Sequence, residues 1–148
     1  MRVNEDDVIE LENFLPYQII LLADRVSRKS AAIVKRSRDM NLSQWRVLAA
    51  VAEAPGRTAN EVVAVTPMDK GLVSRAVKSL IERRLVERRA SDSDGRVAHL
   101  YLTRRGERTY REIARDVRAM EAAMLGALPD VDARKLGKSL ARLLDALR

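Results

Sequence analysis

The sequence has no cysteine and only one histidine, His99, in its 148 residues. The absence of cysteine excludes disulfides, zinc–thiolate sites, iron–sulfur clusters and a cysteine nucleophile. One histidine cannot build a usual zinc site, and the sequence contains neither a G-x-S-x-G segment nor a glycine-rich phosphate loop. We therefore predict that the protein is not an enzyme and uses no catalytic residues, metal or cofactor. His99 lies in a strand-like segment, where a structural role is expected.

Long apolar runs are also absent, because no segment approaches the ~18 apolar residues that cross a membrane. The N-terminal stretch MRVNEDDVIELE is acidic, whereas a secretory signal is basic and then apolar. Aromatic residues make up only 3% of the chain. Trp45 and Tyr101 lie in apolar patterns, so we expect them in the core and not on a base-stacking surface. These features predict a cytoplasmic protein with no membrane partner.

Positive charge is in excess, and its distribution is uneven. The net charge is +7, and residues 69–108 hold eleven Lys/Arg against six Asp/Glu. Residues 1–68 hold nine of each sign, and residues 109–148 hold eight basic against six acidic residues. Most of the excess therefore lies in one stretch of the chain, which favours a surface that faces a polyanion. A generally basic soluble surface is the alternative that charge alone leaves open.

Residues 70–81, KGLVSRAVKSLI, have the pattern of an amphipathic helix without any acidic residue. At about 100° per residue, one side is apolar and the other is small and basic. A helix enters the DNA major groove only if its outer face lacks bulky acids and can lie close to the phosphates. The apolar side comprises Val73, Val77, Leu80 and Ile81, and the outer side comprises Gly71, Ser74, Arg75 and Lys78.

The rest of the chain predicts further helices and one hairpin. A long helix is expected to begin near Pro16, with Asn13 or a neighbour as its cap, and to end near residue 38. Ser43 is the expected N-cap of a second helix, and a Thr58–Glu61 capping box opens a short third one. Asp69 and Thr103 are expected to cap the helices that follow them, and a leucine stripe over residues 136–147 predicts the last helix.

Two strand-like segments, residues 85–88 and 97–102, flank an Asp94-Gly95 turn signal between the fourth and fifth helices. A short helix, a turn, a helix with a basic outer face and a two-stranded hairpin follow one another in the order of a winged helix-turn-helix. The fold predicted is therefore mainly α with a small β-hairpin wing. Asp94 is expected to organise the wing, and Arg96 could reach the adjacent minor groove or its phosphates.

The run MDKGLVSRAVKSLIERRLVERRASDSDGRVAHLYLTRRG, with LSQWRVL at residues 42–48 before it, resembles the MarR family of bacterial transcriptional regulators. The motifs that carry the resemblance are Val73-Ser74-Arg75, Asp94-x-Arg96, and Leu102-Thr103 followed by Gly106. It implies an N-terminal dimerisation helix in residues 1–40, a DNA-binding domain in 41–104 and C-terminal dimerisation helices in 105–148. It also implies a homodimer on a pseudo-palindromic operator, often a repressor, commonly released by a small, often aromatic, acid.

Residue by residue, Ser74 and Arg75 match the family's DNA-contacting pair, and Arg96 matches its wing arginine. Two positions depart from the family pattern: Arg84 stands where Gly is usual, and Gly95 occupies a wing-tip position that is often basic. If Arg84 must adopt a left-handed conformation, it costs on the order of 1 kcal/mol relative to glycine. The predicted DNA contacts are Lys70, Gly71, Ser74, Arg75, Lys78 and Arg96.

An effector pocket, if present, is expected where the first helix, the Trp45 helix and the long fifth helix meet. Tyr17, Arg46 and Arg118 are the candidate lining residues, and Arg46 would suit an acidic ligand. The alternative function is a basic winged-helix module that binds RNA or a protein partner without operator specificity. The narrow major groove of RNA does not admit a helix, so dependence of binding on Arg75 would favour DNA.

Overall fold

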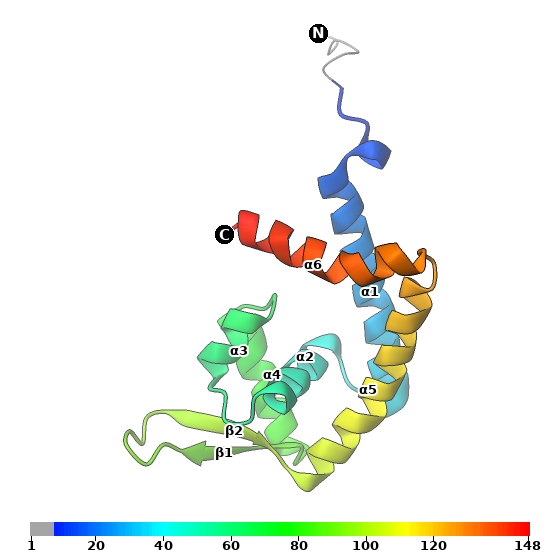
Figure 1. Cartoon of the computed structure of the whole chain (residues 1–148). Helices are drawn as coiled ribbons and strands as arrows, with labels where there is room; N and C mark the ends of the chain where they lie inside the picture. The colour runs from blue at the N-terminus through cyan, green and yellow to red at the C-terminus, as the bar shows by residue number, and fades with distance from the viewer. Residues whose placement is uncertain (1–7) are drawn as a thin grey trace.

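The computed structural model describes residues 8–148 (Figure 1). In chain order the elements are a 3₁₀ turn (Leu11–Asn13), α1 (Leu15–Arg38), α2 (Leu42–Glu53), α3 (Ala59–Val65), α4 (Lys70–Glu82), β1 (Val86–Ala90), β2 (Ala98–Leu102), α5 (Arg104–Leu125) and α6 (Asp130–Ala146). Helices α2 to α4 and the antiparallel β1–β2 hairpin form a winged-helix lobe, and α1, α5 and α6 form a helical arm beside it. The predicted mainly helical fold with a hairpin wing is confirmed. None of the helices in the described range is long and apolar enough to cross a membrane.

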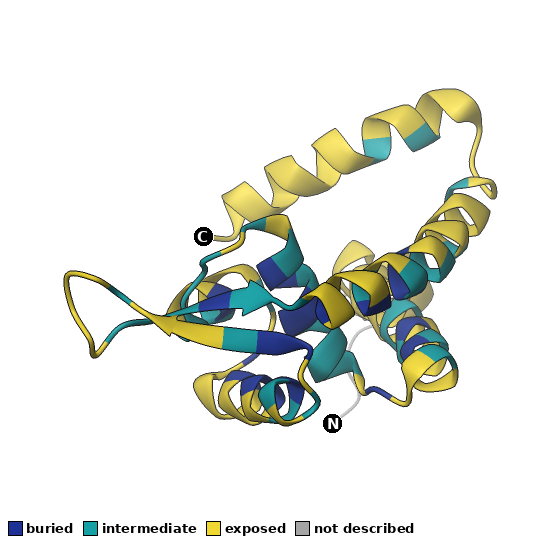
Figure 2. Cartoon of the chain, turned by 90° about the horizontal axis from the view of Figure 1, so that it is seen from below, coloured by how far each residue is buried: buried dark blue, intermediate teal, exposed yellow. Residues whose placement is uncertain are grey.

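The hydrophobic core lies inside the lobe and continues to the lower part of the arm. Apolar residues of α2, α4, β1 and β2 are buried together, and Val34 of α1 and Ile113 of α5 close the same cluster. Figure 2 shows the buried positions gathered in the lobe and where α1 and α5 meet it, whereas α6 is almost entirely exposed. Helix α6 has no buried residue at all. The core therefore stabilises the lobe and joins it to α1 and α5.

Three of the predicted helix caps are confirmed. Thr58 and Glu61 form the expected capping box, with Glu61 N–H donating to Thr58 Oγ1 at 3.2 Å and Thr58 N–H donating to Glu61 Oε2 at 2.7 Å. Asp69 Oδ1 accepts from the amide of Leu72 at 2.7 Å, and Thr103 Oγ1 accepts from the amide of Gly106 at 3.0 Å. These side chains satisfy amides that have no partner inside the helix, so each helix begins where the sequence predicts.

The N-cap predicted for α2 is wrong, whereas the N-cap position of α1 is taken by Phe14, a neighbour of Asn13 as predicted. Ser43 lies inside α2, and Asn41 is the N-cap, because Asn41 and Gln44 form a reciprocal capping box that satisfies two amides. Helix α1 follows Phe14, which makes no side-chain cap, and the side chain of Asn13 donates through Nδ2 to Glu10 Oε2 at 2.8 Å. Pro16 is in the first turn of α1, where its missing N–H breaks no helical bond.

The turn after α2 is attached to the outer edge of β2. The amide of Gly56, which has a φ of 91°, donates to Leu100 O at 2.8 Å, and the amide of Leu100 donates to Arg57 O at 2.9 Å. The ring of His99 donates through Nδ1 to Gly56 O at 2.7 Å. His99 thus holds this turn against the wing, which is the structural role predicted for it.

Arg84 ends α4 in a left-handed conformation, with a φ of 57°. Its amide donates to Ile81 O at 2.9 Å, and the amide of Leu85 donates to Leu80 O at 2.9 Å. These two bonds form a Schellman motif, in which the left-handed position is usually glycine. Leu80 and Leu85 are both buried, as this motif favours. Arg84 therefore carries the cost predicted for a left-handed residue at this position, on the order of 1 kcal/mol of stability relative to glycine.

Replacing Arg84 with glycine is expected to raise the free energy of unfolding by about 1 kcal/mol, because glycine adopts positive φ without steric cost. Urea unfolding followed by circular dichroism measures the change. Arg84→Ala is the matched control, since it removes the same side chain but keeps the strained backbone. Equal stability of Arg84→Ala and Arg84→Gly would show that the side chain, and not the backbone, is responsible.

Candidate nucleic-acid interface

The outer face of α4 is exposed in the way the sequence predicts. Val73, Val77 and Leu80 are buried, and Ile81 is half-buried. The residues that lie exposed on the opposite side are Lys70, Gly71, Ser74, Arg75 and Lys78. Leu72 is also exposed, at 36%. The sequence pattern assigned Leu72 to neither face, because it lies on the boundary between them.

The cations of this surface are not neutralised by neighbouring acids. Within residues 8–148, no carboxylate lies at ion-pair distance from Lys70, Arg75, Lys78 or Arg96. Two other arginines of the lobe are paired, Arg57 with Glu53 at 2.6 Å and Arg89 with Glu87 at 2.5 Å. The charge of α4 is therefore available to an external anion.

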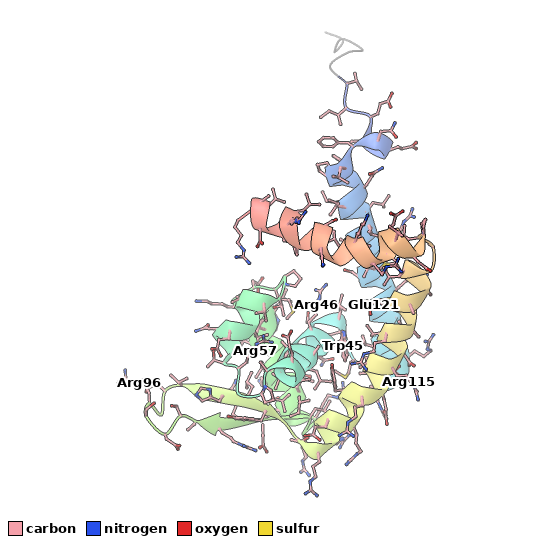
Figure 3. All side chains as sticks on the ribbon, viewed as in Figure 1. Trp45, Arg46, Arg57, Arg96, Arg115 and Glu121 are labelled. Atoms are coloured by element: carbon pink, nitrogen blue, oxygen red, sulfur yellow. The ribbon has the colours of Figure 1, made fainter. Side chains whose placement is uncertain are left out.

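The wing presents Arg96 at the end of the hairpin, away from the rest of the lobe (Figure 3). Asp94 Oδ1 accepts from the amide of Arg96 at 3.0 Å, and Asp94 O accepts from the amide of Val97 at 3.0 Å. Asp94 thus organises the turn as predicted, and it does so through the backbone of Arg96. The guanidinium of Arg96 is left exposed.

Helix α3, which precedes α4, is held at its start by the ionised form of Glu61. The backbone N–H of Thr58, followed by its side chain, lowers the pKa of Glu61 below its ordinary value, because these bonds favour the carboxylate. This stabilisation is therefore present above the ordinary pKa of a glutamate and is lost as the pH falls through the lowered value. The cap is intact at neutral pH.

The three candidate effector residues lie on three different helices. Tyr17 is 49% exposed near the start of α1, beside the ring of Phe14. Arg46 reaches from α2 to α1, with Nη2 3.5 Å from Ser27 Oγ, and Arg118 is exposed on α5. Their role in binding a ligand stays a prediction. Trp45 packs against the core and stacks on Tyr110, with ring centroids 5.6 Å apart.

A cleft of about 570 Å³ lies between α1 and α5, beside the region expected to hold an effector. Its floor is apolar, and three cations of α1 line it: Arg25, Lys29 and Arg36. None of the three has a carboxylate at ion-pair distance in the described part of the chain. The sequence analysis missed these residues, although their spacing along one helix was a signal that could have found them.

An exposed basic helix preceded by a short helix and followed by a hairpin with an exposed arginine defines a winged helix-turn-helix module. The sequence model of the MarR family matches residues 38–97, which cover most of this module. The transcriptional regulator BilQ of Clostridium symbiosum is 28% identical over 93 residues, 63% of this chain and 65% of that protein.

Solved structures share the fold over nearly the whole chain. A MarR/EmrR family regulator from Acinetobacter sp. ADP1 has a TM-score of 0.84 at 22% identity, covering 94% of this chain and 98% of that one. FabT of Streptococcus pneumoniae, solved in complex with DNA, has a TM-score of 0.74 at 22% identity, covering 90% and 94%. Residues 38–97 are thus similar to the MarR family of transcriptional regulators, the family that the sequence motifs indicated.

Proposed function

We propose that the protein is a cytoplasmic, homodimeric regulator of transcription that binds double-stranded DNA sequence-specifically, and that it is a repressor released by a small-molecule effector. The observation that carries the proposal is the exposed outer face of α4 over residues 70–81, which holds no acid and whose cations have no partner among the described residues. A related fold, that of FabT, was solved in complex with DNA.

The exposed residues of α4 between Gly71 and Lys78 have roles that fit the major groove. Gly71 and Ser74 are small and let the helix approach the phosphates on both rims. Arg75 can donate two parallel bonds to the O6 and N7 atoms of guanine, which gives sequence selectivity. Lys78 would contact phosphate and add affinity without selectivity. The exposed Leu72 can contact a thymine methyl group.

The predicted site also includes the first residue of α4 and the end of the wing. Lys70, in the first turn of α4, would contact phosphate. Arg96 at the end of the wing would enter the minor groove beside the half-site or contact its phosphates. A dimer would place two such units in successive major grooves, about 34 Å apart on a pseudo-palindromic operator.

Fluorescence anisotropy tests the proposed function. The duplexes are the region upstream of the protein's own gene and a scrambled duplex of the same composition, each at two salt concentrations. A preference for the native duplex that falls steeply with salt is the expected result, because binding releases condensed counterions. If the preference is absent, selection from a random duplex library locates a site elsewhere. No binding to any duplex at low salt would overturn the proposal and favour a protein partner.

Homodimerisation is proposed from the apolar side chains that the single chain leaves exposed. The upper half of α1 and most of α6 have no buried residue. Leu144 is 70% exposed and Leu147 is 86% exposed, and α1 leaves Leu15, Ile20 and Leu22 more than half exposed. Helices that leave large apolar side chains exposed in this way are typical of an interface between copies.

Leu144→Glu is expected to weaken the dimer at least about tenfold, because burial of a leucine stabilises by ~1.5–3 kcal/mol and a glutamate would have to be desolvated instead. Sedimentation velocity over a range of protein concentrations measures the dissociation constant. Val65→Glu is the control, since Val65 is 53% exposed but lies on the lobe and not on the arm. If both variants dissociate alike, or neither does, α6 is not the dimer interface.

The α1–α5 cleft supports the proposed effector. An apolar floor with unpaired cations at its edge fits an apolar or aromatic carboxylate. Isothermal titration with benzoate and 1-naphthoate tests this, with Lys29→Gln as the cleft variant and Arg28→Gln, whose partner is Asp24, as the control on the same helix. No heat of binding with either acid, together with unchanged DNA affinity, would overturn the proposed effector site but not the proposed DNA binding.

A further inference from the structure

The C-terminal end of α4 is hydrogen-bonded to the end of α1. The guanidinium of Arg83 donates through Nη2 to Arg38 O at 2.7 Å and through Nη1 to Asp39 O at 3.2 Å. Two donors of one planar group thus bind two consecutive carbonyls at the α1 terminus. Two such hydrogen bonds fix the orientation of α4 relative to the end of α1 as well as the distance between them, because hydrogen bonds weaken steeply when they are bent.

One turn earlier, Ser79 of α4 makes a second polar contact, with the start of α2 directly after the end of α1. Gln44 Nε2 donates to Ser79 Oγ at 2.6 Å. The other atom of this amide, Oε1, accepts from the backbone N–H of Asn41 at 2.8 Å and closes the cap of α2. Ser79 is therefore bonded to the side chain that also starts α2. Together, Ser79 and Arg83 tie α4 to residues 38–44, which we call the α1–α2 junction.

The opposite side of the α1–α2 junction is bonded to α5. Arg38 forms an ion pair with Glu112, and one residue before it Ser37 Oγ donates to Asp116 Oδ2 at 3.1 Å. Helix α4 packs mainly against α2, α3 and β1, so the shared core links it to the arm largely through α2, whereas the polar contacts reach the end of α1 directly. The polar contacts of Arg83 and Ser79 therefore connect α4 to the helices of the arm.

We propose that Arg83 and Ser79 are positioning residues, which fix the angle of α4 relative to the α1–α5 arm and thereby set the spacing of half-sites that the dimer selects. The proposal rests on the proposed function of a DNA-binding homodimer. In such a dimer the arm joins the two lobes, so a rotation of each lobe moves its α4 out of register with a half-site one helical turn away. Neither residue needs to contact DNA for this effect.

On DNA, the measured quantity is how the binding affinity depends on the length of the spacer between two half-sites. The probes are duplexes with two copies of the half-site selected by the wild type, separated by the selected spacer or by spacers one and two base pairs longer or shorter. The wild type is expected to lose about tenfold or more in affinity when the spacer changes by two base pairs, a typical cost of a mismatched contact. In the Ser79→Ala, Arg83→Met double variant the loss should shrink to about threefold, with unchanged affinity for a single half-site.

Two further variants separate positioning from stability. Arg83→Lys keeps the charge but cannot hold two carbonyls in one planar fork, so its selectivity should be intermediate. Arg88→Met is the control, because Arg88 is exposed on β1 and makes no side-chain hydrogen bond to a residue that the structure describes. If the double variant lowers the unfolding midpoint but keeps the wild-type spacer profile, the two residues are merely structural and the proposal is overturned.

A second measurement does not require DNA, so it separates failure of this proposal from failure of the proposed function. The chain has no cysteine, so spin labels can be placed at Lys78→Cys on α4 and Arg118→Cys on α5 without background. Labelled chains are diluted with unlabelled ones, and pulsed electron spin resonance measures the distance distribution between the two labels. A narrow wild-type distribution that broadens in the double variant is the expected result. An unchanged distribution would overturn the proposal whether or not the protein binds DNA.

Discussion

Gly106→Ala is expected to lower the free energy of unfolding by about 3 kcal/mol or more, at the upper end of the cost of overpacking. Gly106 is buried in the first turn of α5, where a Cβ atom would lie 1.9 Å from the carbonyl oxygen of Leu85 and 2.9 Å from its carbon. That oxygen cannot move easily, because Leu85 is buried and its carbonyl accepts from the amide of Thr103 at 3.1 Å. Since domains of this size are stable by only ~5–15 kcal/mol, this loss is large.

Thermal and urea unfolding followed by circular dichroism measure the effect. Gly137→Ala is the matched control, because Gly137 is also helical and a Cβ there would meet nothing within 4 Å. Gly137→Ala should raise the free energy of unfolding by up to about 1 kcal/mol, as alanine does in place of glycine inside a helix. Equal unfolding midpoints for Gly106→Ala and Gly137→Ala would show that α5 leaves room for a Cβ atom beside the carbonyl of Leu85.

Arg75→Ala is expected to weaken binding to the selected operator by ~1–3 kcal/mol for each half-site, and to reduce the preference over scrambled duplex by the same amount. The side chain is exposed on α4 and has no carboxylate partner in the described residues, so stability should not change. Fluorescence anisotropy with both duplexes separates a loss of selectivity from a general loss of affinity.

Two control variants identify the cause of any loss. Arg118→Ala removes the same charge from the exposed surface of α5 and should leave binding close to wild type. Lys78→Ala should weaken binding to both duplexes alike and reduce the salt dependence, as expected for a phosphate contact. If Arg75→Ala behaves like Lys78→Ala, Arg75 contacts only phosphate and another residue of α4 reads the bases.

Local patterns in the sequence determined most of the secondary structure. The caps Thr58, Asp69 and Thr103 depend on a side chain and an amide three residues apart, so they can be recognised without the fold. The two faces of α4 follow from the helical period alone. Where two local choices compete, as Asn41 and Ser43 do at the start of α2, the sequence pattern chose wrongly because both residues are good caps.

The sequence by itself therefore determined the order of the elements, the resemblance to the MarR family, and the apolar and basic sides of α4, since these rest on neighbours a few residues apart. Only the tertiary structure decided that Arg84 is left-handed, that Gly106 lies against Leu85, and that Arg83 reaches the end of α1. The same holds for the cleft between α1 and α5. Most of these features join residues far apart in the chain, and no local pattern specifies which distant backbone atom a side chain will meet.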